Sequence, residues 1–264
     1  MDISNWQSGI TGTVARQWAT AGINHGIVKM GGGNVGVYEL STHRAQVSAL
    51  RSAGIPASRY WFNGRDASIA AQVSAVRQQL ATTPLAPGER FMWDVEQEDD
   101  MPRWTPAEVE EAARALVDLV PYSRQVVYVS SSVTKAADWS GAVALGLTLM
   151  VADYGLNNGV PSSMPLVGYW PRAQVWIWQY TSTGSLPGYS GNLDLSTGDL
   201  NDLWTVHDLQ EALNAVAGAG TLTVDGAYGP KTRAAVTYFQ RTQGLTVDGD
   251  AGPKTLAKLA AVAG

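Results

Sequence analysis

The chain has 264 residues, enough for one large domain and a small second one. It is 45% hydrophobic and 16% charged with a net charge of −5, which is typical of a folded soluble protein and excludes a basic nucleic-acid-binding surface. No apolar stretch approaches the roughly 20 residues that span a bilayer. The absence of cysteine excludes thiol chemistry and disulfides, and three scattered histidines disfavour a zinc hydrolase.

Apolar, β-rich runs alternate with helical periods over the first 200 residues. We expect strands at 3–6, 23–30, 55–62, 91–96, 126–130, 147–154, 175–180 and 193–195, and early helices at 14–21, 43–52, 69–81 and 107–119. The last helix has a capping box, with Thr105 as the cap, Pro106 at the first position and Glu108 at the third. Eight strands in this alternation predict an α/β fold, a (β/α) barrel with an irregular second half; a doubly wound open sheet is the alternative.

Acidic residues stand at the ends of several predicted strands, which favours the barrel. Asp94 and Glu96 close the fourth strand, Asp153 lies near the end of the sixth, Asp194 lies in the eighth and Asp2 starts the first. Because side chains two apart on a strand point to the same face, Asp94 and Glu96 should lie side by side. Two carboxyl groups in unequal settings are what cleavage of a glycosidic bond requires.

The last 60 residues contain an internal repeat. Residues 225–232 are matched by 248–255, and in each copy Asp-Gly predicts a turn and Gly-Pro opens a helix. We expect helices at 206–217, 230–242 and 253–262, and therefore two domains, 1–204 and 205–264. The predicted core of the second domain consists of Leu209, Leu213, Val216, Val236, Phe239, Leu256 and Leu259.

Four ordered segments resemble motifs of glycoside hydrolase family 25, the muramidases of fungi, bacteria and phages. They are residues 2–7, 94–96, 151–154 and 178–184, the last followed by Asp194, and the resemblance covers roughly residues 1–200 while departing from the usual pattern at 31–86. Residues 206–262 resemble the three-helix peptidoglycan-binding domain found beside many cell-wall hydrolases. The combination implies an endolysin-like lysozyme that hydrolyses the β-1,4 bond between N-acetylmuramic acid and N-acetylglucosamine without a cofactor.

The resemblance and the strand-end pattern together assign roles to the acids. Glu96 is the expected general acid, whose protonated form nearby anions and partial burial would favour; the alternative is a solvated carboxylate at a strand end. Asp94 is its partner, either attacking the sugar directly or orienting the substrate's own acetamido group. Asp2 and Asp194 would shape the electrostatic field and bind sugar, or else be a frayed terminus and a turn residue.

Ten tryptophans and ten tyrosines against three phenylalanines fit a cleft that stacks on sugar rings, and the alternative for each of them is packing in the core. The expected substrate-binding residues are Tyr60, Trp61, Trp93, Asp153, Tyr154 and Trp178, with Asp153 as an alternative loop anchor. Five carboxylates between Asp94 and Asp100 could hold a cation, but they lack the glycine-spaced loop of a calcium site, so no metal is expected.

Two other functions remain open: a non-catalytic wall-binding protein, which the retained acids oppose, and a peptidoglycan amidase or peptidase, which the histidine and cysteine counts oppose. The expected partner is bacterial peptidoglycan, with no nucleic acid, no membrane insertion and a monomeric chain. The opening residues carry no secretory signal, so we expect synthesis in a host cytoplasm and action at the bacterial cell wall. In the second domain, the N–H groups of the Asp-Gly turns could capture a peptide-stem carboxylate, or the turns could be purely structural.

Overall fold

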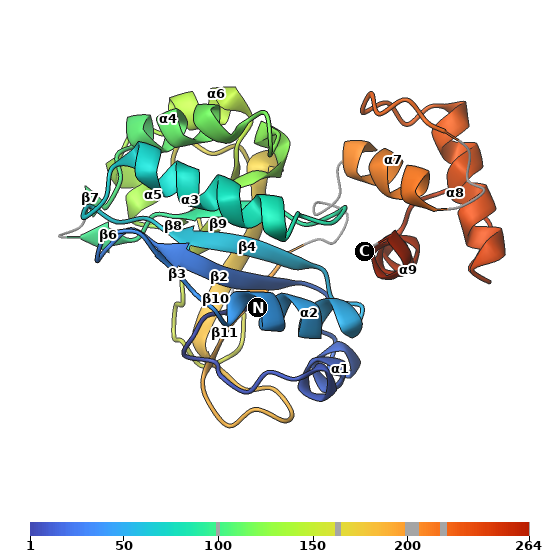
Figure 1. Ribbon diagram of the computed structural model, residues 1–264, viewed down its shortest axis with the longest axis horizontal. Helices are drawn as coiled ribbons and strands as arrows, with labels where there is room; N and C mark the ends of the chain where they lie inside the picture. Colours follow the sequence, from blue (N-terminus) through green and yellow to red (C-terminus); the bar gives the residue numbers. More distant parts are fainter. Residues whose placement is uncertain (99–100, 162–164, 199–205, 217–220, 264) are drawn as a thin grey trace.

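The computed structural model describes residues 1–98, 101–161, 165–198, 206–216 and 221–263 (Figure 1). Within these ranges, a sheet closes on itself because β1 pairs with both β2 and β11. The eight strands of this barrel are β1 (Asp2–Ile3), β2 (Gly26–Gly32), β4 (Ala57–Phe62), β5 (Phe91–Asp94), β8 (Gln125–Ser130), β9 (Thr148–Ala152), β10 (Val175–Gly184) and β11 (Leu193–Thr197). The predicted barrel is therefore confirmed, and closure excludes the open sheet.

The second half of the barrel is irregular, as expected. Strand β11 runs antiparallel to both of its neighbours, β10 and β1, whereas the other neighbouring pairs are parallel. A single turn, η1 (Tyr122–Arg124), leads into β8, and the connections after β8 carry only short helices in the described ranges: α5 (Val133–Ala136), α6 (Ser140–Leu145) and η2 (Arg172–Gln174). Outside the barrel, β3 (Tyr38–Glu39) extends β2, and β6 (Gln97–Glu98) pairs with β7 (Met101–Pro102).

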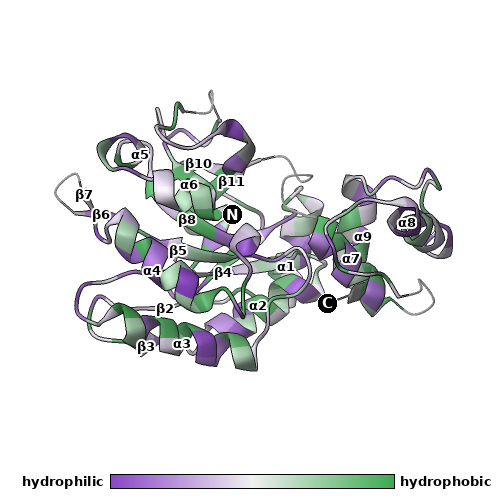
Figure 2. Cartoon of the chain, turned by 90° about the horizontal axis from the view of Figure 1, so that it is seen from above, coloured by the Kyte–Doolittle hydropathy of each residue, from purple (hydrophilic) through white to green (hydrophobic). Residues whose placement is uncertain are grey.

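Four longer helices cover the outside of the barrel: α1 (Gly12–Thr20), α2 (His43–Ser52), α3 (Ile69–Thr82) and α4 (Pro106–Leu116). Helices α1 and α2 pack together on one side, whereas α3, α4 and α6 pack on the other (Figure 1). The predicted capping box is present at the start of α4, where Thr105 and Glu108 exchange hydrogen bonds. Each helix carries both hydrophobic and hydrophilic stretches, as a helix with one face on a core should (Figure 2).

The first strand is shorter than predicted and begins earlier, at Asp2 rather than Ile3. The chain leaves the sheet after Ile3 because the Gln7 side chain accepts hydrogen bonds from the Ser4 N–H (2.8 Å) and the Ser4 hydroxyl (3.1 Å). This local turn ends the strand after two residues. Asp2 is therefore part of the barrel wall rather than a frayed end.

Two apolar layers follow from the alternation of side chains along each strand. The barrel interior is filled by Ile27, Tyr60, Met92, Val126, Met150 and Trp176. The residues between them point outward and pack under the helices, where Trp61, Trp93, Trp104 and Trp139 are wholly buried. The interior layer forms an apolar floor beneath the carboxyl ends of the strands.

At the opposite end of the barrel, Glu89 gathers several partners below β4 and β5. It is 1% exposed and pairs with Arg51 (2.6 Å) and with the fully buried Arg59. Arg124 donates to the Glu89 carbonyl (2.9 Å) and also reaches Asp208 (3.2 Å) of the C-terminal region. The C-terminal helices thus meet the barrel where β5 and β8 begin, away from the carboxyl ends of the strands (Figure 1).

The C-terminal region contains α7 (Val206–Ala215), α8 (Pro230–Thr242) and α9 (Pro253–Ala263). All seven predicted core residues lie in one apolar cluster, with Val216 at its partly buried edge. The proposed boundary at residues 204 and 205 lies outside the described residues.

Each Asp-Gly turn of the repeat is tied to a buried glutamine on the preceding helix. Gln240 accepts hydrogen bonds from the backbone N–H groups of Asp248 and Gly249 and donates to the Asp248 carboxylate and the Thr255 hydroxyl. Gln210 makes the same set of bonds around the first turn, to Asp225, Gly226 and Thr232.

The Asp carboxylates accept from the next N–H groups, those of Ala227 and Asp250. These turn N–H groups are thus engaged within the domain, which favours the structural interpretation of the turns over carboxylate capture.

We predict that Gln240→Leu destabilises the second repeat by about 3 kcal/mol, because it leaves buried backbone N–H groups without an acceptor. Hydrogen exchange of the amides of residues 245–252 should accelerate, while the barrel amides keep their protection. The control is Gln243→Leu, the same substitution at a half-buried side chain three residues away. Equal protection in the two variants would contradict the structural role of Gln240.

Candidate active site at the carboxyl end of the barrel

The four predicted acids come together at one end of the barrel. Asp2 on β1 lies directly across from Asp194 on β11, and the interaction between their carboxyl groups contributes to the shifted pKa of each. Asp94 ends β5 and Glu96 follows it. Charge interactions link Asp94 to Glu96, Asp194 and Asp2. Carboxyl groups from three distant segments of the chain therefore share one site.

Burial divides these acids unequally. Asp94 is 5% exposed, whereas Glu96 is exposed. Burial, followed by the charge of Glu96, raises the pKa of Asp94 well above its ordinary value, and Lys29 and Arg103 oppose that rise. The sequence led us to expect partial burial at Glu96, but the structure places it on Asp94, because β5 ends at Asp94 and Glu96 has already left the sheet.

Asp2 and Asp194 are also shifted. Burial and the neighbouring Asp194 raise the pKa of Asp2 well above its ordinary value. Burial likewise raises the pKa of Asp194. The site therefore favours protonation at several carboxyl groups in the absence of substrate.

An amide side chain fixes the position of Asp2. Gln179 on β10 donates its Nε2 hydrogen to Asp2 Oδ2 (3.2 Å). Its Oε1 accepts from the hydroxyls of Tyr128 (2.6 Å) and Tyr154 (3.3 Å). Because a hydroxyl hydrogen must point at the carbonyl oxygen, the two tyrosines set which end of the amide faces Asp2. Burial raises the pKa of Tyr154 to about 12, so its hydroxyl stays a donor.

Gln179 and Tyr128 were not singled out from the sequence. Gln179 lies within the 178–184 segment that carries the family resemblance, and Tyr128 stands between the valines of β8. A polar residue within a buried apolar strand was the available signal for both.

The predicted aromatic residues divide between the inside and the outside of the barrel. Tyr60 belongs to the interior layer, and burial, then the charge of Asp94, raises its pKa well above the ordinary value. Tyr154 lies beside Gln179 at the site. These two residues keep their place among the candidate site residues.

The structure does not bring Trp61, Trp93 or Trp178 to the site, which corrects the expectation for these three. All belong to the layer under the outer helices. Trp93 stacks near Trp104, and its N–H donates to Gln125 (3.1 Å). The reason is strand parity, because each of these residues is next to an inward-facing residue and so points outward.

Asp153 anchors the loop that follows β9. Its carboxylate accepts from the Ser131 hydroxyl (2.6 Å) and the Gly155 N–H (3.3 Å), and its carbonyl accepts from the Trp178 indole (2.7 Å). These bonds match the loop-anchor alternative raised from the sequence.

Within the described residues, no group of three or more acidic or histidine side chains is placed to hold a metal ion, and no helix is long and apolar enough to cross a membrane. Asp99 and Asp100, part of the acidic run considered for a cation, lie outside those residues.

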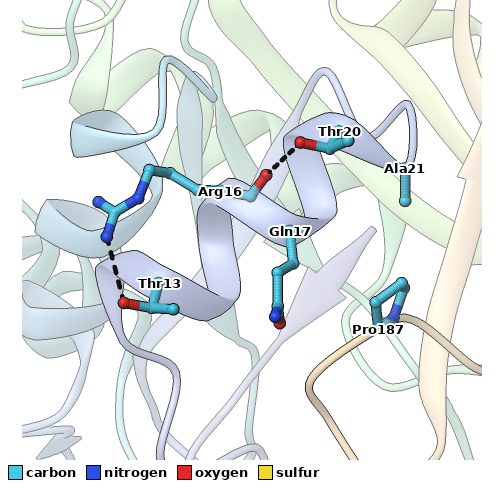
Figure 3. Close-up of a pocket in the computed structure, with 6 residues that line it drawn as sticks. All are labelled: Thr13, Arg16, Gln17, Thr20, Ala21 and Pro187. Atoms are coloured by element: carbon cyan, nitrogen blue, oxygen red, sulfur yellow. Dashed lines mark hydrogen bonds between the residues drawn. The ribbon is translucent and has the colours of Figure 1, made fainter.

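A separate hollow of about 480 Å³ lies along α1 against Pro187 (Figure 3). Its polar groups bond to one another: Arg16 donates to Thr13 (3.1 Å), and Thr20 donates to the Arg16 carbonyl (3.0 Å). It has no carboxyl pair and lies apart from the four acids.

The raised pKa of Asp94 predicts that Asp94→Asn stabilises the fold at neutral and higher pH, by about 0.5–2 kcal/mol. The folded protein holds the proton more tightly than the unfolded chain, so folding is favoured at low pH and that contribution is lost as pH rises through the folded-state pKa. The variant has no carboxyl to ionise and escapes this loss. The free energy of unfolding in urea, measured across pH, should be similar for variant and wild type in acid and higher for the variant as pH rises. A variant that becomes less stable than wild type as pH rises would refute the assignment.

The comparisons with known proteins agree with this geometry. Residues 1–189 match glycosyl hydrolases family 25, and residues 205–259 match the putative peptidoglycan binding domain. No curated protein matches the chain significantly.

Three solved structures have a similar fold. The glycosyl hydrolase 25 GHIP of Streptococcus pneumoniae has a TM-score of 0.60 and 18% identity, covering 75% of this chain and 86% of its own. The lysozyme of Streptomyces coelicolor has a TM-score of 0.58 and 20% identity, covering 75% and 90%. The catalytic domain of endolysin ply40, from bacteriophage P40 of Listeria monocytogenes, has a TM-score of 0.55 and 19% identity, covering 77% and 93%.

The match to residues 1–189 spans well over half of the chain. The resemblance inferred from four short motifs is thereby confirmed. The chain belongs to glycosyl hydrolases family 25, as a lysozyme-type glycoside hydrolase that carries a peptidoglycan-binding domain and acts on cell-wall peptidoglycan.

Proposed function

We propose that Glu96, Asp94, Asp2 and Asp194 carry out hydrolysis of the β-1,4 bond between N-acetylmuramic acid and N-acetylglucosamine. The observation that supports this proposal is the convergence of the four acids at the carboxyl end of the barrel. In barrels of this class, chemistry takes place at that end, because loops from many strands meet there.

Glu96 acts as the general acid. It gives its proton to the bridging oxygen as the glycosidic bond breaks, and it then takes a proton from the water that attacks the sugar. Both transfers need contact with substrate and solvent, and Glu96 is the exposed member of the Asp94–Glu96 pair.

Asp94 works as the anion that faces the developing positive charge on the sugar ring. It either attacks the anomeric carbon or holds the substrate's acetamido group in position to do so, and either path retains the configuration. Burial opposes ionisation of Asp94, but once ionised its charge acts strongly, because water is excluded there. Asp2 is held by Gln179 and adds to the field, while Asp194 and Tyr154 contact the sugar.

We predict that Glu96→Gln lowers kcat by about 10²–10⁴-fold, the usual contribution of a positioned acid. The measurement is release of reducing ends from purified peptidoglycan, with mass analysis of the fragments. Glu110→Gln on the outer face of α4 is the control and should keep wild-type activity.

The products also separate the alternatives. New reducing ends that carry muramic acid support the proposal, whereas new amino groups would indicate an amidase or peptidase. A wild-type chain that releases neither would be a non-catalytic wall-binding protein.

The finer proposal for the second domain is that residues 205–264 retain a monomeric enzyme on insoluble walls, in an endolysin-type lytic role. The domain has its own apolar core and, beside its second turn, a hollow of about 370 Å³. The surface of the hollow is mainly apolar, and Asp248, Asp250 and Lys254 add charged groups at it, a combination that suits a peptide stem.

We predict that a chain ending at Gly198 loses at least tenfold in retention on insoluble walls, since one of two attachment points is gone. It should still cleave soluble glycan fragments at close to the wild-type rate. Sedimentation of walls with the Glu96→Gln protein, full-length and shortened, measures retention without digestion. Equal retention would exclude this role for the second domain.

A further inference from the structure

Two cations stand beside the buried acid, and the catalytic roles proposed above do not use them. Lys29 Nζ lies 4.2 Å from the centre of the Phe62 ring, and the Arg103 guanidinium carbon lies 5.4 Å from the same centre. Phe62 on β4 is the direct neighbour of Asp94 on β5. Both positive charges therefore lie against the Phe62 ring, on the strand next to the one that carries Asp94.

The fold positions Lys29 by strand parity. Lys29 is two residues beyond Ile27 on β2, so both side chains point into the barrel, and it is paired with the interior residue Tyr60. Its ammonium interacts electrostatically with both Asp94 and Glu96. A lysine in this place loses hydration and retains its charge only because the acids are near.

Arg103 arrives from a different part of the chain. Its backbone N–H donates to the Glu96 carbonyl (2.7 Å) just after β7, which pairs with β6. The contact ties the arginine to the segment that carries the acid pair. Its Nε is buried without a hydrogen-bond partner, so the guanidinium is fixed by the ring and by charge.

We propose that Lys29 and Arg103 are positioning residues that supply the counter-charge for Asp94, so that Asp94 is the anion of the pair while Glu96 carries the proton. The inference rests on the proposed function. It adds to that function that Asp94 is ionised and that Glu96 is protonated. Without these cations, the buried Asp94 would face negative neighbours alone, and its neutral form would dominate over a wider pH range.

The groups that face Asp94 come from every surrounding element. The charged ones are Glu96, Asp2, Asp194, Lys29 and Arg103, and the titratable hydroxyls are Tyr38, Tyr60 and Tyr128. The tyrosines stay neutral near pH 7, because burial raises the pKa of each one. Lys29 and Arg103 are the positive charges that act directly on Asp94.

The test compares Lys29→Met, which removes the charge, with Lys29→Arg, which keeps it. The pH dependence of kcat/KM on soluble peptidoglycan fragments reports the ionisation of the free enzyme. We expect Lys29→Met to shift the acidic limb of the kcat/KM profile to higher pH by about one unit. At pH values below that limb, kcat/KM then falls about tenfold, while KM stays within twofold of wild type.

Lys29→Arg should restore the wild-type limb, and Arg103→Met should move it in the same direction as Lys29→Met. Arg77→Met, a surface arginine paired with Asp118 outside the barrel, is the control that leaves the profile unchanged. An unshifted acidic limb in both Met variants overturns the inference. So does a rise in KM at every pH, which would mean that the cations bind substrate instead.

A second measurement does not need turnover. Carboxyl ¹³C NMR of aspartate-labelled protein, with Asp94 assigned through Asp94→Asn, should show Asp94 titrating at higher pH in Lys29→Met than in wild type. If the wild type is active but Asp94 titrates at the same pH in Lys29→Met as in wild type, the counter-charge proposal is refuted and the proposed function stands. A wild type that releases no muramic acid ends refutes the proposed function, whatever Asp94 does.

Discussion

Repulsion among carboxyl groups is the constraint on which the rest of the site depends. Two unit charges 4 Å apart repel by about 4 kcal/mol at the effective dielectric constant of a protein surface, and the site gathers four acids. At Asp2 and Asp194, burial raises the pKa of both carboxyl groups, which favours their neutral forms. Asp94, buried and close to Glu96, has the charges of Lys29 and Arg103 against it. The repulsion is therefore relieved differently at different acids, and this difference makes their chemical roles unequal.

The apolar floor gives these charges their strength. Tyr60, Met92 and Trp176 belong to the apolar cluster that fills the barrel interior. In that surrounding, burial raises the pKa of Asp94, and a single hydrogen bond from Gln179 can fix the orientation of Asp2. The packing of the barrel and the electrostatics of the site are therefore one arrangement. A looser interior would admit water and weaken every charge interaction at once.

The sequence predicted what depends on local patterns. Strand and helix positions follow from periodicity, the cap at Thr105 from its spacing to Glu108, and the acids from their places at strand ends. The sequence could not say which face of a strand looks inward. Strands buried on both sides read as continuous apolar runs with no alternation, so Trp61 and Trp93 were placed on the wrong side.

Partners that meet only through closure were equally inaccessible. Gln179 and Asp2 are 177 residues apart, and no local sequence pattern around either residue predicts their contact. Lys29 lay within a correctly predicted strand, but its proximity to Asp94 depends on the order of β2, β4 and β5 around the barrel. The repeat in the second domain gave its turns and helices, yet the buried Gln210 and Gln240 that hold those turns come from outside the repeated segments.

Closure of the barrel also assembles the site, because both depend on the pairing of β1. This strand of two residues joins β2 to β11 and places Asp2 opposite Asp194. Pairing across nearly the whole barrel domain is slow, since the chain must close a long loop before the contact stabilises it. A molecule whose sheet is still open lacks the Asp2–Asp194 pair, the Gln179 hydrogen bond and the apolar floor together. The second domain closes shorter loops than the barrel does, from the Gln240–Thr255 hydrogen bond, 15 residues apart in the chain, to the packing of α7 against α9, so it can fold before the barrel closes. Wall attachment can then precede catalytic competence, and cleavage activity reports complete closure of the barrel more directly than secondary structure does.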